Sequence, residues 1–474
     1  MDARSSPQPI IRFAKQRACP GHPMPVHITR NAEQKCKFYF SRGASQKILA
    51  INTGFTGDFG YYLPEAFAGR DPKVEEKAVS VNDYTPIVET RYFTFGDEKN
   101  PFVLSSGEVL FPVTLAYETY GNPDNKNRTI LVLHALTGDA HAAGYSRDAV
   151  EKAQARGQAP KPGWWHHMIG PGKPFDTDKF FVVCSNVIGG CRGSTGPSSP
   201  DPATDRPYGS RFPFISIKDM VSAQARLMDH LGIEQIFCAA GGSMGGTQAL
   251  QWAVDFPHRV RSVIPIACTA RHSAQNIAFY EVGRHSITSD LDFNGGDYYG
   301  TEGPRRGLAM ARMVAHITYM SEKSLHEKFA RRIQAPKSDP GHESLPQFQV
   351  NSYLLHQGSS FVDRFDANSY IVITRALDYF DLSADFEDDL SKAFDRVNAK
   401  FLVISFSSDW HYPPRDSKMI VNALRANDID VTYSDIAADW GHDSFLIKDV
   451  IHGKLGLLIR GFLDNLDKEL SNAD

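Results

Sequence analysis

The sequence predicts an α/β protein in which helices cover both faces of a mostly parallel central sheet. Apolar runs of strand length alternate with amphipathic helical patterns, and this alternation is typical of parallel sheets. Several runs are apolar at nearly every position, as expected of strands that are covered on both faces. A stretch from about residue 270 to about residue 398 instead contains helical patterns and few β-branched runs. We therefore expect a helical cap, or lid, inserted over the carboxyl edge of the sheet.

The regular part of the sequence begins at about residue 92. Strands are predicted at 129–133, 180–185, 235–240, 260–266, 401–406 and 430–434. Helices of the core are predicted at 219–231, 247–256 and 415–426, and helices of the cap at 307–319, 322–332 and 369–379. Gly232 and Pro257 follow the first two core helices and are typical residues after a helix end. The chain is thus divided into an N-terminal extension (1–90), a core (91–268 and 397–474) and a cap (269–396).

The N-terminal extension differs in composition from the rest of the chain. Residues 1–57 contain nine basic residues and two acidic ones, and no continuous apolar segment that would form a secretory signal. This composition is compatible with an organelle transit peptide, with a disordered tail, or with a sequence that is over-extended upstream of a start at Met24. We expect a cytoplasmic protein, with mitochondrial import through the basic segment as the alternative.

Charge and hydropathy exclude several classes of protein. Lys and Arg number 51 and Asp and Glu 55, so that the formal net charge is −4. This near balance argues against a partner that is nucleic acid or a membrane surface. No apolar run approaches the roughly 18 residues that span a bilayer. We therefore expect a globular protein that acts on small molecules.

Cysteine and histidine spacing gives no sign of a metal centre. The six cysteines include no C-x-x-C pair, which argues against a zinc ribbon and against a secreted disulfide scaffold and predicts a reducing compartment. The neighbouring His166 and His167 point apart and are a poor pair of ligands. We expect neither a metal nor a bound cofactor.

The sharpest motif is the sequence GGSMGG at residues 241–246, which lies between a predicted strand and a predicted helix. It matches the G-x-S-x-G nucleophile elbow in its required strand–turn–helix context. Small residues two before and two after Ser243 let the strand and the helix approach each other closely. The hydroxyl would then stand at the sheet edge, above a helix N-terminus whose dipole favours negative charge. Ser243 is therefore the candidate nucleophile.

A serine nucleophile needs a base, and an acid must orient that base. In folds with this elbow the acid and then the histidine follow the serine along the chain, each in a loop after a strand. Asp409 follows the strand at 401–406, and His442 follows the next predicted strand. Asp435 and Asp439 are rival acids, and His411 is a rival base. The order along the chain favours Asp409 and His442.

Acyl chemistry also needs hydrogen-bond donors for the oxyanion that forms. One donor is expected from the backbone N–H that follows the nucleophile, which belongs to Met244. The second is expected from the loop after an early strand. The strand at 129–133 leads into HALTGD at 134–139, which makes the N–H of Leu136 the candidate.

One arginine differs in its surroundings from the other arginines of the cap. Arg271, Arg284 and Arg305 are predicted to be surface charges. Arg312 instead lies in the segment LAMARMV at 308–314, in which all the other residues are apolar. A lone arginine beside an apolar helical face indicates a guanidinium that is buried or directed into a pocket. The alternative is that Arg312 is a surface charge like the others.

Taken together, the motifs resemble the homoserine O-acetyltransferase family, the bacterial-type enzymes of methionine biosynthesis in the α/β-hydrolase superfamily. The resemblance covers about residues 92–465. It includes HALTGD (134–139), GPG (170–172), CSNV (184–187), GSTGPSS (193–199), the elbow, SAQN (273–276), HITY (316–319), FDANSY (365–370) and GHD (441–443). The resemblance implies the α/β-hydrolase fold and assigns Ser243, Asp409 and His442 as nucleophile, acid and base.

The resemblance also implies a substrate pair and a mechanism. Arg312 would bind the carboxylate of the amino-acid substrate, and Asp443 its ammonium group. The acetyl group of acetyl-CoA would pass through Ser243 to the side-chain hydroxyl of L-homoserine in a ping-pong reaction, and the chain would form a homodimer through its cap helices. Three alternatives stay open: a serine or other alcohol as acceptor, succinyl-CoA as donor, and an esterase in which water resolves the acyl-enzyme.

Overall fold

The computed structural model describes residues 87–334 and 347–472 of the chain. The N-terminal extension, and with it the transit-peptide alternative, lies outside these residues except for 87–90. Those four residues already contact the core, since Val88 N donates to Tyr145 O at 2.9 Å and Thr90 Oγ1 donates to Glu118 at 2.8 Å. Residues 87–90 of the predicted extension thus contact the core, and the boundary at residue 91 stays a prediction.

In the described residues, the central sheet has eight strands in the order β1-β4-β8-β5-β11-β12-β13-β14. β1 and β4 pair antiparallel, as do β4 and β8, and all later neighbours pair parallel. The strands are β1 (Arg91–Phe95), β4 (Val113–Tyr120), β8 (Phe181–Ser185), β5 (Thr129–Leu133), β11 (Cys238–Gly242), β12 (Ser262–Ile266), β13 (Lys400–Phe406) and β14 (Val431–Ile436). The prediction of a mostly parallel sheet is confirmed.

The alternation of side chains along β5 shows how the core is built. All five of its residues are buried. Leu131 and Leu133 belong to the apolar cluster on one face of the sheet, and Ile130 and Val132 belong to the cluster on the other face. Successive side chains of a strand point to opposite faces, so a continuous apolar run is what a sheet covered on both sides requires.

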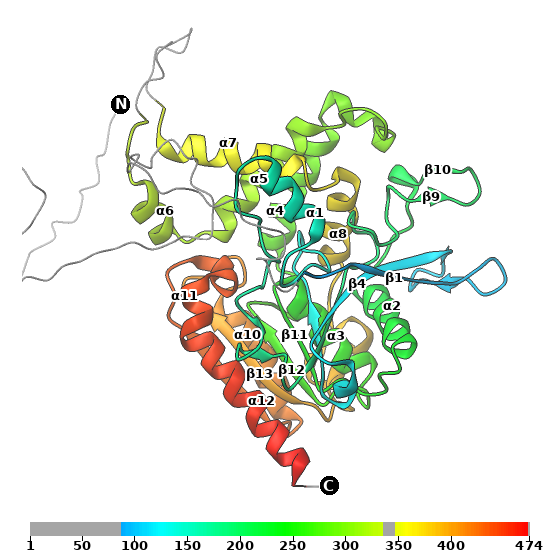
Figure 1. Cartoon of the computed structure of the whole chain (residues 1–474), viewed down its shortest axis with the longest axis vertical. Coiled ribbons are helices and arrows are strands. Elements are labelled where there is room, and N and C mark those ends of the chain that lie inside the picture. The colour runs from blue at the N-terminus through cyan, green and yellow to red at the C-terminus, as the bar shows by residue number, and fades with distance from the viewer. Residues whose placement is uncertain (1–86, 335–346, 473–474) are drawn as a thin grey trace, which may run out of the picture. The chain divides into compact units, whose positions relative to one another are not determined.

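Helices cover both faces of the sheet. The first cluster includes apolar residues of α2 (Ile217–His230), α3 (Met244–Asp255) and α10 (Pro414–Ala426). The second includes Ile459 and Leu463 of α12 (Gly456–Ser471), which runs along the opposite face (Figure 1). The short elements are β2 (Phe102–Val103), β3 (Val109–Leu110), β6 (Ile169–Gly170), β7 (Phe175–Asp176), β9 (Pro200–Asp201), β10 (Arg206–Pro207), α1 (Arg147–Ala155) and α11 (Lys448–Val450).

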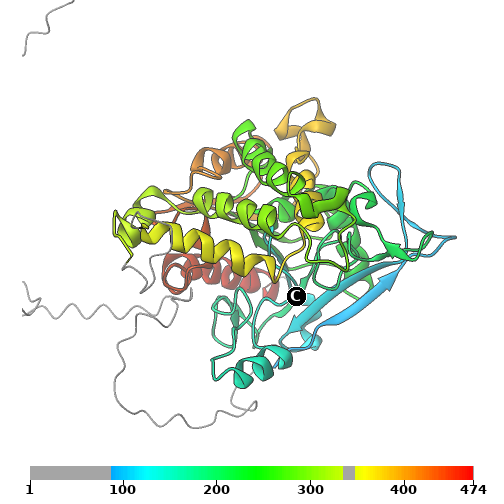
Figure 2. The same ribbon diagram turned by 90° about the horizontal axis from the view of Figure 1, so that it is seen from above.

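The segment between β12 and β13 is helical in the part that the structure describes. It holds α4 (Ala274–Thr288), α5 (Arg305–Tyr319), α6 (Glu322–Phe329), α7 (Gln349–Val362), α8 (Ala367–Asp378) and α9 (Leu390–Ala393). α5 packs against α4 on one side and against α7 on the other, and α5 and α7 run side by side in Figure 2. α5 also contacts the segment that carries His442, which places this helix at the carboxyl edge of the sheet. The cap boundaries 269 and 396 stay a prediction.

Candidate active site

The nucleophile elbow is tighter than the sequence predicted. β11 continues through Gly242, because Gly241 and Gly242 still pair with β12, and α3 begins at Met244. The strand at 235–240 and the helix start at Thr247 were therefore both misplaced. Only Ser243 separates the two elements, and its φ of 58° and ψ of −125° make the turn. Its N–H donates to Ile266 O at 2.9 Å, which fixes the turn to β12.

Two glycines let the elbow approach the neighbouring strand β5. A Cβ atom at Gly241 would lie 2.5 Å from the carbonyl oxygen of Leu133, and a Cβ atom at Gly245 would meet the same oxygen. Real Cβ atoms do not come this close to a carbonyl oxygen, so any side chain at either position would force β5 and α3 apart. The glycines before and after Ser243 are thus required by close packing at the sheet edge.

Asp409 and His442 form a buried pair at the carboxyl edge of the sheet. The Nδ1 atom of His442 lies 2.8 Å from Oδ2 of Asp409, and the two residues are 2% and 3% exposed. The other carboxylate oxygen, Oδ1, accepts the N–H groups of His411 and Tyr412, each at 2.9 Å. A carboxylate held at both oxygens can orient the imidazole and stabilise its charged form.

The segment that carries His442 packs directly against the elbow. A Cβ atom at Gly242 would lie 2.5 Å from the ring of Phe445, whose centroid is 5.8 Å from that of His442. The structure therefore brings the segments of Ser243, Asp409 and His442 together at one edge of the sheet, as the sequence predicted.

The rival residues have other partners. Asp439 forms an exposed ion pair with Lys323, and Asp435 accepts a hydrogen bond from Ser405. The ring of His411 contacts that of His442 at 5.0 Å, but its Nε2 atom lies 3.3 Å from the hydroxyl of Tyr280. Burial, helped by the two neighbouring histidines, holds the pKa of His411 well below its usual range. This geometry favours Asp409 and His442 over their rivals.

The loop with the predicted oxyanion donor is held next to the first turn of α3. Gln248, which is fully buried, donates to His134 O at 3.2 Å and to Met244 O at 3.3 Å. Across the described chain, neither the N–H of Leu136 nor that of Met244 has a protein acceptor. Among the described residues neither N–H group thus has a protein partner, and their role as oxyanion donors stays a prediction. Sequence reasoning missed Gln248, for which a polar residue inside a buried helix was the only signal.

Comparisons with known proteins show which family the chain belongs to. A family model described as alpha/beta hydrolase fold matches residues 128–449. The homoserine O-acetyltransferase of Methanosphaerula palustris is 54% identical over 366 residues, which are 77% of this chain and 71% of that protein. That of Solidesulfovibrio magneticus is 50% identical over 389 residues, which are 82% and 95% of the two chains. The chain belongs to the homoserine O-acetyltransferase family.

A solved structure shows the same fold at lower identity. Esterase E22 matches with a TM-score of 0.69 and 28% identity, over 80% of this chain and 100% of its own. The predicted fold and the family resemblance are thus confirmed. In the described part of this family member, no helix combines the length and the apolar composition needed to cross a membrane. Nor do the described residues contain a group of three or more potential metal ligands.

In this family member, Arg312 and Asp443 lie near the buried pair without neutralising each other. The guanidinium of Arg312 lies 4.9 Å from the centre of the Phe361 ring, and among described residues it forms no ion pair within 4.0 Å. Burial raises the pKa of Asp443, while the nearby charges of His442 and Arg312 act in the opposite direction. Arg312 thus lies close enough to Asp443 to act on its pKa, although no ion pair joins the two side chains.

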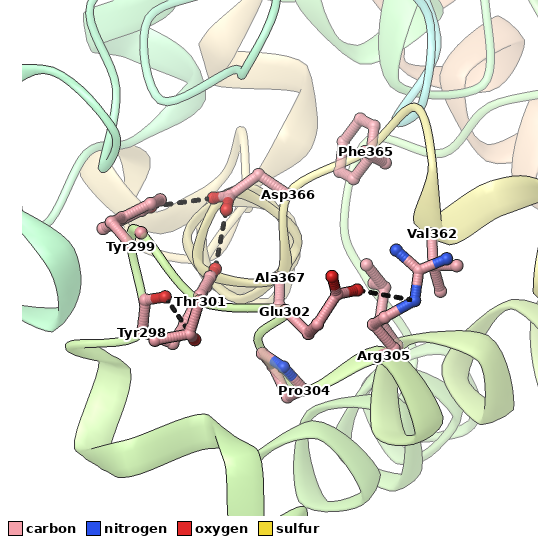
Figure 3. Close-up of a pocket in the computed structure, with 12 residues that line it drawn as sticks. Tyr298, Tyr299, Thr301, Glu302, Pro304, Arg305, Val362, Phe365, Asp366 and Ala367 are labelled. Atoms are coloured by element: carbon pink, nitrogen blue, oxygen red, sulfur yellow. Dashed lines mark hydrogen bonds and ion pairs between the residues drawn. The ribbon is translucent and has the colours of Figure 1, made fainter.

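Two observations lie apart from the predicted site. A cavity of about 210 Å³ lies between residues 298–308, which include the start of α5, and residues 362–367, which join α7 to α8 (Figure 3). None of its lining residues is a predicted site residue. The carboxylate of Asp366 in its wall is already bound by the hydroxyls of Tyr298 at 2.6 Å and Tyr299 at 3.1 Å. Arg284, predicted as a surface charge, is instead 8% exposed and pairs with Asp378 at 2.6 Å, because it lies on the face of α4 that packs against α8.

Proposed function

We propose that the chain transfers the acetyl group of acetyl-CoA to the side-chain hydroxyl of L-homoserine. The observation that carries this proposal is the buried Asp409–His442 pair, whose segment packs against the elbow of Ser243. The names of relatives that are 50–54% identical over most of the chain support homoserine as the acceptor and acetyl as the transferred group.

In the first half-reaction, His442 accepts the proton of the Ser243 hydroxyl while Oγ attacks the thioester carbonyl. The oxyanion of the tetrahedral intermediate accepts hydrogen bonds from the N–H groups of Met244 and Leu136. The C–S bond then breaks, and the leaving sulfur receives the proton from His442. Free CoA departs and the acetyl group stays on Ser243 as an ester.

In the second half-reaction, the hydroxyl of homoserine gives its proton to His442 and attacks the acetyl carbonyl. The same two N–H groups bind the oxyanion. The bond to Ser243 breaks, and Oγ takes back the proton from His442. O-acetyl-homoserine leaves, and the enzyme returns to its starting state.

Arg312 and Asp443 would select the acceptor. The guanidinium pairs with the α-carboxylate, and the carboxylate of Asp443 pairs with the ammonium group. Water and simple alcohols carry neither charge and gain nothing from the pair. Serine as acceptor, or succinyl-CoA as donor, uses the same chemistry and remains an alternative. The similarity to esterase E22 favours hydrolysis as the second candidate function.

We further infer a homodimer formed through the helices of the insertion. α5 exposes Met310 and Ile317, which lie seven residues apart on one face and are 53% and 43% exposed. Leu355 of the neighbouring α7 is 56% exposed. Apolar side chains gathered on adjacent helices are typical of a surface that a second copy covers.

Release of CoA from acetyl-CoA, measured with and without L-homoserine, tests the proposed function. We expect a burst of one CoA per chain without acceptor and continued turnover only when L-homoserine is present. Continued release without acceptor would favour hydrolysis and contradict the proposal. Parallel assays with L-serine and succinyl-CoA decide between the alternative substrates.

A further inference from the structure

The helical insertion is bound to the turn of Asp409 through the first turn of α4. Asn276 lies in that turn and is fully buried. Its Nδ2 donates to the carbonyl oxygen of His411 at 2.7 Å, and its Oδ1 accepts the N–H and the hydroxyl of Ser273 at 3.1 Å and 2.5 Å. One end of the amide therefore caps its own helix, and the other end contacts a different part of the chain.

The peptide group that Asn276 binds is also the one that holds Asp409. The carbonyl of His411 and the N–H of Tyr412 belong to the same peptide unit, and that N–H donates to Oδ1 of Asp409 at 2.9 Å. A continuous chain of hydrogen bonds thus runs from Asn276 through this peptide to Asp409 and on to His442. Such chains polarise their members and fix the plane of the peptide.

A second contact joins the segment before α4 to the turn 409–412 through side chains. The hydroxyl of Tyr412 lies 2.8 Å from Nε2 of His272, and both residues are buried. His272 and Asn276 flank the start of α4, directly after the chain leaves β12. The turn 409–412 is therefore tied to the insertion by a backbone contact and by a side-chain contact.

We propose that Asn276 is a positioning residue for Asp409. By fixing the peptide between residues 411 and 412, it aims the N–H of Tyr412 at Oδ1 and leaves Oδ2 directed at His442. The inference deepens the proposed function, since it rests on Asp409 and His442 acting as acid and base. A residue that served only to cap α4 would leave the acylation of Ser243 unchanged.

The matched variants are Asn276→Ala and Ser273→Ala. The second removes the hydroxyl contacts of the α4 cap but keeps the N–H of residue 273 and the amide that binds His411 O. We measure the acylation rate with p-nitrophenyl acetate, a small ester probe. We expect Asn276→Ala to slow acylation about tenfold with KM within about twofold of wild type, and Ser273→Ala to leave the rate within about twofold. Equal slowing by both variants would overturn the inference.

The isosteric Asn276→Asp covers the case in which the alanine variant does not fold. Its side chain keeps the acceptor that caps α4, but when ionised it cannot donate to His411 O. We expect the same loss of acylation rate as in Asn276→Ala. A wild-type rate in a folded Asn276→Asp whose carboxyl group is ionised would overturn the inference.

A double variant shows whether Asn276 acts through Asp409. If it does, Asn276→Ala has no further effect once Asp409→Asn is present, because the group that it positions has lost its role. Independent, multiplied losses would overturn the inference. The probe ester needs neither CoA nor homoserine. If the variants change the rate of ester acylation as expected but the wild type does not acetylate homoserine, only the proposed acceptor is refuted.

Discussion

Ser243 carries the backbone strain of the candidate site. A positive φ in a residue with a Cβ atom costs on the order of 1–3 kcal/mol, and such strain is typical of functional turns. The surrounding packing of β11, β12 and α3 maintains it, because the chain has one residue in which to pass from strand to helix.

We predict that Ser243→Gly is more stable than the wild type although it cannot form an acyl-enzyme. Glycine adopts positive φ without strain, so we expect a gain of about 1 kcal/mol in the free energy of unfolding, measured in urea. Ser243→Ala is the control, since it removes the hydroxyl but keeps the Cβ atom. An equal gain in both variants would mean that the hydroxyl, and not the backbone, is the source of strain.

Arg312 and Asp443 are predicted to act on the second half-reaction alone. Arg312→Ala should leave the CoA burst intact and raise the KM for L-homoserine by about tenfold to hundredfold, the worth of charged hydrogen bonds. Arg306→Ala, on an exposed position of the same helix, is the control and should change neither step. Equal damage to the burst and to the acceptor step would contradict the assigned role of Arg312.

The raised pKa of Asp443 gives the acceptor step a pH dependence. Its carboxylate can pair with an ammonium group only when ionised. The KM for L-homoserine should therefore rise as pH falls through the raised pKa of Asp443. Asp443→Asn should show a high KM without this rise. A wild-type KM that is independent of pH on the acid side would remove Asp443 from acceptor binding.

At the scale of the residue, the sequence predicts site residues that directly follow a strand, because their position in the fold follows from the order of the strands along the chain. Ser243, Asp409 and His442 each follow a strand, and parallel strands end at one edge. Gln248 and Asn276 could not be predicted in their roles, because each binds a carbonyl group of a loop that is distant in sequence. Which loops meet depends on the packing of whole elements.

At the scale of the element, the join between β5, β11 and α3 leaves no room for a side chain at Gly241 or Gly245. Gly245→Ala would place a methyl group against Leu133 O, and we expect a loss of about 2 kcal/mol or more in unfolding free energy, together with lost activity. Gly461→Ala is the matched control in α12, where a Cβ atom meets nothing within 4 Å and should stabilise by about 0.5–1 kcal/mol. A Gly245→Ala variant with an unchanged unfolding free energy would contradict the close approach of α3 to Leu133.

Elements were predictable where burial on both faces makes a strand wholly apolar. β5 was predicted to the residue for that reason. β4 was not predicted, and its Glu118 explains why: this carboxylate is fully buried and is bound by Thr90, Tyr120 and His141. A buried polar residue whose hydrogen-bond partners are distant in sequence interrupts the apolar pattern by which a core strand is predicted. The end of β11 was misplaced because its glycines continue the ladder instead of ending it.

At the scale of the whole molecule, buried neutral histidines predict sensitivity to acid. Burial lowers the pKa of His272 to about 3 and that of His316 to about 2. The unfolded chain binds these protons near pH 6.5 and the folded chain does not. Stability should therefore fall as pH drops below about 6.5, by about 1.4 kcal/mol per pH unit for each histidine.

Unfolding in urea at several pH values checks this expectation. His316→Phe should flatten the slope between about pH 6 and pH 4 relative to wild type. His326→Gln, at an exposed position, should leave the slope unchanged. Equal slopes in all three proteins would show that His316 is not buried neutral in the folded state.

The proposed homodimer is tested by light scattering. Ile317→Asp places a charge on the apolar face of α5 and should convert a dimer to a monomer. Leu457→Asp is the control, since Leu457 is 70% exposed on α12, on the far face of the sheet. A monomeric wild type, or dimers of both variants, would contradict an interface on α5.

The central claim is that one acetyl group passes through Ser243. Mass spectrometry of the protein after mixing with acetyl-CoA tests it most directly. We predict one acetyl group per chain on the peptide that contains Ser243, its disappearance on addition of L-homoserine, and no acetylation of Ser243→Ala. An acetylated acceptor formed by Ser243→Ala at the wild-type rate would contradict the account.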